Sequence, residues 1–426
     1  MNLKHSKNIF NGGVKLNLGV NGIHIKRRPV IQKKILPALF TLSLILSACT
    51  TTEKFSETGK STENVFHEPE SLTLLFGGDI MAHEENFLMK DFSLIWNDVK
   101  PLVSGADLSF ANIEAPVMDE KKWSGYPKFN MHSDYVQKAV DAGFNVFSLS
   151  NNHSTDLGLK GILSTKKTFE NLQKENKTSE RPIYFSGIKE EPYEDNFDYT
   201  LIEKNGFRII FIAITELLNI PVHTETLNYV PPTKKEREKL IEFIKNIRAQ
   251  EKTDFLILSV HTSEEEYVLN VNEKRKSFYR ELLSCGVDVL WANHPHVVRE
   301  YEIYGDINDS LIKKLIFYGN GNTISGQRRN PMLSKPENPR ENTGDGLLFE
   351  VKLIKHYNKE YPQVSVSETK AYYITTYIDS EKNFVVKKLD DTFIEALEKE
   401  KRYDWASYIK SRKKISESTK ETVIWQ

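Results

Sequence analysis

The chain has 426 residues, 39% of them hydrophobic and 11% aromatic, which excludes a largely disordered protein and allows one large domain or two ordinary ones. Residues 1–48 contain eight of the 58 Lys and Arg residues and no acid, so the remaining chain has 50 basic residues against 59 acidic ones. This acidic remainder excludes nucleic acid as the expected partner, because phosphate contacts require a basic face.

The basic N-terminal segment continues into an apolar run from Ile35 to Ala48, which is 14 residues long and uncharged. This run is short for a membrane span and typical of the hydrophobic region of a signal peptide. It ends in Leu-Ser-Ala-Cys, which resembles the processing site of bacterial lipoproteins, whose cysteine carries the lipid. We therefore expect a lipoprotein-type signal peptide over 1–48 and an exported protein anchored to a membrane of the bacterial cell envelope through lipidated Cys49. An ordinary cleaved signal or an uncleaved anchor is the alternative.

The second cysteine, Cys285, then has no partner, so we expect no intramolecular disulfide. Residues 49–70 are polar and rich in Ser, Thr and Glu, which predicts a flexible tether.

From residue 71 onward, strand and helix patterns alternate along the chain. We expect strands over 72–78, 107–114, 145–151, 183–187, 206–215, 253–261, 287–294, 315–322 and 345–354, and a hairpin over 371–389. We expect helices over 92–106, 133–144, 159–176, 233–250, 273–286 and 390–414. Alternation predicts a layered α/β fold with helices outside, and the later consecutive strands predict a mixed sheet. We expect one domain over 71–392 and a helical C-terminal tail over 393–426.

Polar side chains follow most of the predicted buried strands at the points where these strands end. They are Asp79, Asn112, Glu114, Asn151, Asn152, His153, Asp156, His261 with the glutamates after it, His294, His296, Asn320 and Asn322. Taken singly, each such residue is more often a helix cap or a turn residue than a ligand. Because ligands bind in α/β proteins at the carboxyl edge of the sheet, six strands would together bring these groups to one rim.

Carboxylate, amide oxygen and imidazole, without thiolate, form a ligand set that suits Mn²⁺, Fe or Zn²⁺. The set is large enough for two divalent metal ions about 3.5–4 Å apart. In the segment His294-Pro295-His296, the proline fixes its own φ and is expected to hold His294 in an extended conformation.

The series "GGDIM", "ANIEAPV", "LSNNHSTDLG", "VHTSEEEY", "NHPHVV" and "YGNGNTISGQ" resembles the CapA family, which is named for a protein of poly-γ-glutamate capsule biosynthesis. The resemblance runs from about residue 71 to 390. That family is similar to the calcineurin-like metallophosphatases, so the resemblance implies a metallophosphatase-like α/β sandwich.

The resemblance also implies roles for single residues. Asp79 and His296 would bind one metal, and Glu114 would bridge the two metals. The second metal would be held by Asn152, His261 and His294. His153 would donate a proton to the leaving oxygen, and Asp156 would orient it.

Two departures from the family pattern concern the site. Metallophosphatases usually have a histidine two residues after the first aspartate, where this chain has Met81 and, two residues later, His83. The first metal would therefore be short of a ligand and weakly held. The usual His-Trp-Gly-x-Glu segment is replaced by the sequence that starts at His261.

Three functions remain open. The first is a metal-dependent phosphoesterase-like hydrolase acting on a phosphoester. The second is a non-catalytic accessory lipoprotein that works with membrane partners in making or exporting an anionic polymer such as poly-γ-glutamate. The third, a protein that kept the fold and lost its metals, is disfavoured because the series of candidate ligands is intact.

Overall fold

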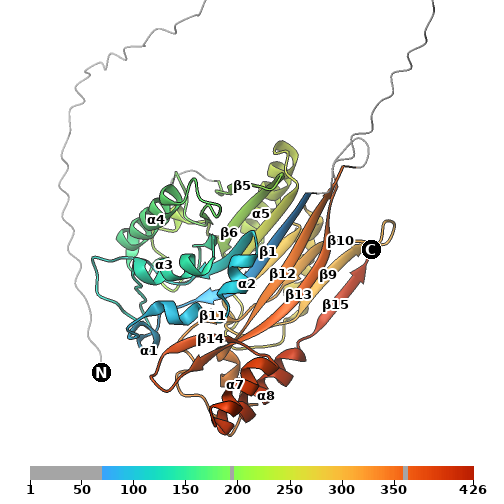
Figure 1. Cartoon of the computed structure of the whole chain (residues 1–426). Helices are drawn as coiled ribbons and strands as arrows, with labels where there is room; N and C mark the ends of the chain where they lie inside the picture. Colours follow the sequence, from blue (N-terminus) through green and yellow to red (C-terminus); the bar gives the residue numbers. More distant parts are fainter. Residues whose placement is uncertain (1–69, 192–195, 358–362) are drawn as a thin grey trace, which may run out of the picture. The chain divides into compact units, whose positions relative to one another are not determined.

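The structure is a computed structural model that describes residues 70–191, 196–357 and 363–426 (Figure 1). The predicted signal peptide, its lipidated Cys49 and the predicted tether up to residue 69 lie outside the described residues. Glu70, the last residue of the predicted tether, is already the first residue of a strand. In the described part of the chain, no helix combines the length and the apolar character needed to cross a membrane.

The strands of the described residues belong to one mixed sheet of fifteen strands. They are β1 (Glu70–Ile80), β2 (Leu108–Ile113), β3 (Val146–Ser148), β4 (Tyr184–Ser186), β5 (Thr200–Lys204), β6 (Phe207–Thr215), β7 (Phe255–His261), β8 (Val289–Asn293), β9 (Tyr301–Asp306), β10 (Leu311–Phe317), β11 (Asn322–Ile324), β12 (Asp345–His356), β13 (Gln363–Ile378), β14 (Phe384–Lys388) and β15 (Glu421–Trp425). The main path runs β4-β3-β2-β1-β12-β13-β10-β8-β7-β6-β5.

The helices are α1 (Glu84–Phe87), α2 (Lys100–Gly105), α3 (Ser133–Ala142), α4 (Gly158–Glu175), α5 (Lys234–Gln250), α6 (Glu273–Ser284), α7 (Asp391–Lys399) and α8 (Tyr403–Glu417), with short 3₁₀ turns η1 (Phe92–Trp96), η2 (Thr224–Thr226) and η3 (Pro339–Gly344). The predicted α/β class with a mixed sheet and helices outside is confirmed.

Two parallel halves of the sheet are joined by antiparallel strands. Strands β1 to β4 run parallel to one another, as do β6, β7, β8 and β10. The long strands β12 and β13 connect the halves; β12 pairs with β1, and β13 lies on the other side of β12 (Figure 1). All parallel strands of each half therefore end on one edge.

The two halves pack face to face, which makes the fold a sandwich. Leu72, Leu74 and Phe76 of β1 belong to the same buried cluster as Phe211 of β6 and Trp291 of β8. The outer faces carry two further clusters, one beneath α2, α3, α4, α7 and α8 and one beneath α5 and α6. Because the central strands are buried on both faces, they appear in the sequence as continuous apolar runs.

The helix expected over 92–106 is interrupted in the structure. A 3₁₀ turn, η1, begins after Asp91, whose side chain accepts a hydrogen bond from the Ser93 backbone N–H. α2 then starts anew at Lys100, with Pro101 in its first turn. Proline is favoured at a helix start and cannot continue a preceding helix, which explains the break.

The C-terminal segment is not purely helical, which corrects the expectation of a helical tail over 393–426. After α7 and α8, the chain forms β15, which pairs in parallel with β9 at an edge of the sheet (Figure 1). α8 is also tied to the body by a buried network. Arg412 Nε donates to Asp345 at 2.7 Å, and Arg328 Nη1 donates to the same carboxylate and to the Tyr408 hydroxyl.

Candidate metal centre

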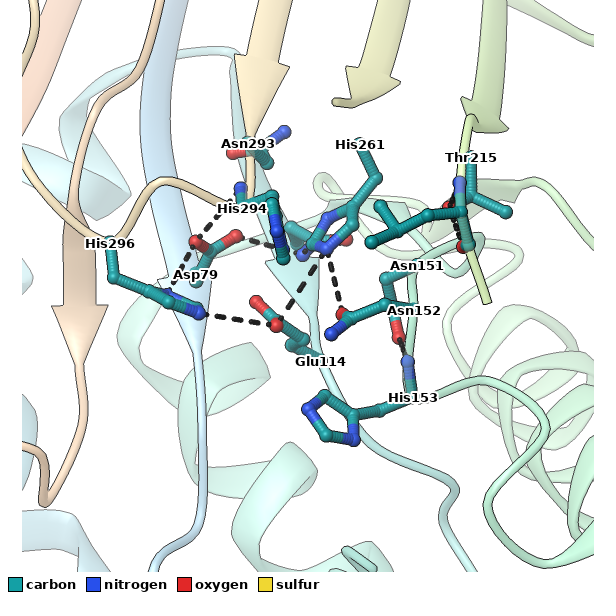
Figure 2. A network of polar contacts seen from close by, with 12 residues as sticks. Asp79, Glu114, Asn151, Asn152, His153, Thr215, His261, Asn293, His294 and His296 are labelled. Carbon is teal, nitrogen blue, oxygen red and sulfur yellow. Dashed lines mark hydrogen bonds and ion pairs between the residues drawn. The ribbon is translucent and has the colours of Figure 1, made fainter. Parts of the chain in front are cut away.

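The carboxyl ends of the parallel strands bring all the predicted ligands to one place (Figure 2). Asp79 lies at the end of β1, Glu114 follows β2 and His261 ends β7. The six predicted ligands are at most 3% exposed; they are Asp79, Glu114, Asn152, His261, His294 and His296. The structure therefore clusters every residue of the predicted ligand set.

A close contact between two glycines positions Asp79. A Cβ atom at Gly78 would lie 2.0 Å from the carbonyl oxygen of Gly321, whose own φ is +68°. Only glycine tolerates such an approach and such a φ without strain. The Asp79 backbone N–H donates to the Gly321 carbonyl at 3.1 Å, so the loop after β10 holds the end of β1 in register.

Glu114 lies at the centre of the cluster. Its Oε1 is 3.7 Å from His261 Nε2 and 3.5 Å from His296 Nε2. The side chain is 0% exposed, and neither carboxylate oxygen has a hydrogen-bond donor. Burial, and then the charge of Asp79, raises the pKa of Glu114 well above its usual value. A buried carboxylate without a partner is costly, and a bound cation would remove that cost.

His261 and Asn152 form one side of the cluster. His261 Nε2 lies 2.9 Å from Asn152 Oδ1, and its Nδ1 lies 3.4 Å from Asn112 Nδ2. Asn112 also donates to Asp79 Oδ1 at 2.8 Å. Burial, and then the neighbouring imidazoles, lowers the pKa of His261 well below its usual value. A lowered pKa favours the neutral imidazole, which is the form that binds a metal.

His296 is oriented by hydrogen bonds on its Nδ1. This atom lies 3.0 Å from Asn322 Oδ1 and 3.2 Å from Asp79 Oδ2. The Asn322 amide nitrogen donates to Gln327 and to a backbone carbonyl, so its oxygen is left to accept. Such partners place the proton on Nδ1 and leave Nε2, which faces Glu114, for a metal. Burial alone lowers the pKa of His296, but the Asp79 hydrogen bond and charge outweigh it and raise the pKa.

His294 has a backbone conformation that the sequence does not predict. Its φ is +98° and that of His296 is +55°, so the expected extended conformation of His294 is wrong. Strained conformations persist where surrounding contacts hold them. Here the His294 N–H donates to Asp79 Oδ2 at 3.3 Å, and the carbonyl of Pro295 accepts from the Tyr267 N–H at 2.9 Å.

The charged groups form three overlapping sets that could hold metal ions. Within each set, the ligand atoms lie within 4.8 Å of one another. The sets are Asp79–Glu114–His296, Glu114–His261–His294 and Glu266–His294–His296. Burial, followed by the charge of His296, also lowers the pKa of His294, whose Nδ1 has no hydrogen-bond partner. The donor set and the unpartnered buried atoms fit a divalent cation.

His153 and Asp156 form a pair beside the cluster. His153 Nδ1 lies 2.7 Å from Asp156 Oδ2, and the same oxygen accepts from the Phe129 backbone N–H at 2.8 Å. The imidazole packs edge-on against the Phe129 ring, with centroids 4.6 Å apart. The structure therefore places the predicted proton donor against its predicted orienting carboxylate.

Met81 and His83 line a cavity that His296 also lines. The His83 Nδ1 accepts from the Gly326 backbone N–H at 3.2 Å, and burial, followed by the charges of His296 and His153, lowers the His83 pKa to about 3. Among the described residues, His83 belongs to none of the candidate metal sets. It does not replace the histidine absent at position 81.

Three further residues of the site had no predicted role. Asn112 and Asn322 could be recognised as candidates because both occur where strands end. Their hydrogen bonds, Asn112 with Asp79 and Asn322 with His296, could not be predicted without the folded structure. Glu266 is the third of three consecutive glutamates after β7. The sequence around it did not indicate which of the three glutamates lies near the histidines.

His296 of the cluster lines a cavity of about 960 Å³. Its lining includes Met81, His83, Tyr126, Lys128, Phe129, His153, Asp156, Glu266, Tyr267, His296, Arg329 and Arg340. A cavity of this size is large for a single phosphate group and fits a drug-sized ligand or part of a chain.

The fold and the cluster define a layered α/β protein with a candidate metal centre at its strand ends, an arrangement consistent with calcineurin-like metallophosphatases. Residues 73–327, more than half of the chain, match the family described as "Bacterial capsule synthesis protein PGA_cap". The chain belongs to this family, and the matched range includes every candidate site residue.

Two relatives have names that refer to capsule or polymer synthesis. "Capsule biosynthesis protein CapA" of Bacillus anthracis is 24% identical over 337 residues, which cover 76% of this chain and 77% of that protein. "PGA biosynthesis protein CapA" of Bacillus subtilis (strain 168) is 25% identical over 264 residues, which cover 60% of this chain and 64% of that protein.

Proposed function

We propose that this chain is a metal-dependent, phosphoesterase-like hydrolase that acts at the cell envelope in the synthesis or export of an anionic capsule polymer. The observation that carries the proposal is the Glu114 carboxylate, which is fully buried, lacks a donor and lies between His261 and His296. Two ions of Mn, Fe or Zn, held by the six predicted ligands, would polarise a phosphoryl oxygen and stabilise the charge that develops on it.

His153 is the proton donor in this proposal. Asp156 accepts from its Nδ1 and holds the ring. Nε2, which lies 3.5 Å from the Asn219 amide nitrogen, would protonate a leaving oxygen in the cavity. Phe129 supports both members of the pair, through its N–H and through its ring.

The cavity mouth supports an anionic substrate. Lys128 and Arg340 line the cavity and are exposed, and neither side chain has an ion pair within the described ranges. Arg329 also lines it and pairs with Glu85. The two unpaired cations would attract the charged groups of a chain that extends beyond the metal centre.

Lys128→Gln or Arg340→Gln should weaken binding of a defined oligo-γ-glutamate by up to about fivefold each, the usual worth of an exposed ion pair. Titration of the metal-loaded protein with the labelled oligomer at two salt concentrations measures this effect. Lys122→Gln is the matched control, because Lys122 is exposed and does not line the cavity. Equal losses of affinity in all three variants would contradict the proposal that Lys128 and Arg340 bind the substrate at the cavity mouth.

A non-catalytic accessory lipoprotein is the second candidate. It is favoured by the names of the two relatives, which refer to biosynthesis, and by Met81 in place of a metal-binding histidine. Assay of fully metallated protein on p-nitrophenyl phosphate and bis-p-nitrophenyl phosphate separates the two. Absence of hydrolysis of both would favour the accessory role.

The membrane anchor is a separate part of the proposal. Cys49→Ala should leave an unlipidated precursor or move the protein to the soluble fraction, because the lipid would no longer be attached. Labelling with a radioactive or clickable fatty acid measures this directly. A wild-type chain that takes up no label would end the lipoprotein assignment.

A further inference from the structure

We infer that Glu266 is an additional metal ligand. It supplies coordination on the His294–His296 side of the centre, where Met81 provides none. This inference rests on the metal centre of the proposed function but not on hydrolysis. Glu266 Oε1 lies 4.0 Å from His294 Nε2, and Glu266, His294 and His296 form one of the sets whose ligand atoms lie within 4.8 Å. Two ligand atoms bound to one ion at about 2.1 Å each are at most about 4.2 Å apart.

The loop that carries Glu266 is held by a buried arginine. Arg299 is 2% exposed. Its Nη1 donates to Glu264 Oε2 at 2.7 Å, its Nη2 donates to the Glu265 carbonyl at 3.2 Å and its Nε donates to the Val268 carbonyl at 2.7 Å. A guanidinium tolerates burial when its donors are satisfied in this way. These three contacts hold the chain on both sides of Glu266.

A backbone contact joins this loop directly to the paired histidines. The Tyr267 N–H donates to the carbonyl of Pro295, the residue between His294 and His296. Tyr267 itself has φ +66°. Its ring lies 6.1 Å from the His296 ring. The position of Glu266 relative to both imidazoles is therefore set by the fold.

The three consecutive glutamates have different environments. Glu264 pairs with Arg299, whereas Glu265 is exposed and its side chain has no ion pair in the part of the chain that the structure describes. The Glu266 side chain is 36% exposed, and its ion-pair contact is with His294. No lysine or arginine within the described ranges pairs with Glu266, so its carboxylate is available to a cation.

Unpartnered buried groups in the same centre support a bound cation in the centre as a whole, while the contact of Glu266 is with the other ring nitrogen of His294, Nε2. His294 is 3% exposed, and its Nδ1 has no hydrogen-bond partner. Both oxygens of Glu114 are also unpartnered. Met81, at 2% exposure, offers only a thioether, which is a poor ligand for Mn²⁺. A carboxylate from the loop after β7 is the harder ligand that such an ion prefers.

The test compares Glu266→Gln with Glu265→Gln in the full chain. Mn²⁺ is titrated calorimetrically, and bound metal is counted by elemental analysis after dialysis against limiting Mn²⁺. We expect Glu266→Gln to lower the affinity of one ion by roughly 10-fold or more, the scale of losses on removing a group that supports a metal site, and Glu265→Gln to match wild type. Circular dichroism of the metal-free variants checks that both fold.

The outcomes separate this inference from the proposed hydrolase. If Glu266→Gln binds Mn²⁺ with wild-type stoichiometry and affinity, Glu266 is not a ligand, although the metal centre stands. If Glu266→Gln loses metal while wild type hydrolyses no phosphoester, the ligand assignment holds and the hydrolase fails. If wild type binds no Mn²⁺, Zn²⁺ or Fe²⁺, both are overturned.

Discussion

Replacing Glu114 with glutamine should remove at least one metal ion per chain while the fold is retained. The carboxylate lies within reach of both His261 and His296 and belongs to two of the three candidate metal sets. Glutamine keeps the shape and removes the charge that would allow two cations to lie close together. Elemental analysis of the purified variant measures the loss.

A second readout of the Glu114 variant is thermal stability. A ligand at 100 times its dissociation constant stabilises the folded state by about 2.7 kcal/mol, so added Mn²⁺ should raise the melting temperature of wild type more than that of the variant. Without metal, the variant should be no less stable than wild type, because an amide is cheaper to bury than an unpartnered carboxylate.

The control for Glu114→Gln is a buried acid outside the centre. Glu302 is 1% exposed and pairs with Arg280 rather than with the candidate ligands. Glu302→Gln should leave the metal content unchanged. Unchanged metal in Glu114→Gln as well would remove Glu114 from the site.

His153→Ala should keep the metals and slow hydrolysis by roughly 10²–10⁴-fold, the usual contribution of a positioned general acid. His153 Nδ1 is hydrogen-bonded to Asp156, and His153 belongs to none of the candidate metal sets that the described residues form. The effect should shrink for substrates with good leaving groups such as p-nitrophenolate, since these need no proton. Rates for matched aryl and alkyl esters measure this difference.

The comparison variant for His153 is His296→Ala. His296 belongs to two of the candidate metal sets, and its Nε2 faces Glu114. Its removal should lower metal occupancy, whereas removal of His153 should not. The opposite pattern, with metals lost from His153→Ala and retained in His296→Ala, would reverse the roles of the two histidines.

Local sequence patterns were sufficient to predict the α/β class and to predict that the candidate ligands lie at one edge of the sheet. Continuous apolar runs identify strands buried on both faces. A polar residue just after such a run must lie at the strand end, and parallel strands share that edge. For Asp79, Glu114 and His261, the position in the chain therefore predicted the position in the fold.

Two short strands and the C-terminus required the tertiary structure. β5 and β9 were not predicted, and β15 was expected to be part of a helical tail. β15 is a strand because its backbone groups pair with β9, more than a hundred residues earlier in the chain. Such pairing depends on which edge remains open, and that is not a local property of residues 421–425.

The same distinction applies inside the candidate centre. Among Glu264, Glu265 and Glu266, the sequence offers three equivalent carboxylates. The contacts of Arg299 and the Tyr267–Pro295 backbone hydrogen bond place the third beside His294. Likewise, proline alone predicts an extended His294, but the hydrogen bond from its N–H to Asp79 accompanies a φ of +98°. Residue types and their spacing determined which candidate ligands the strand ends carry. Long-range hydrogen bonds decided where these side chains point, because their partners are distant in the sequence.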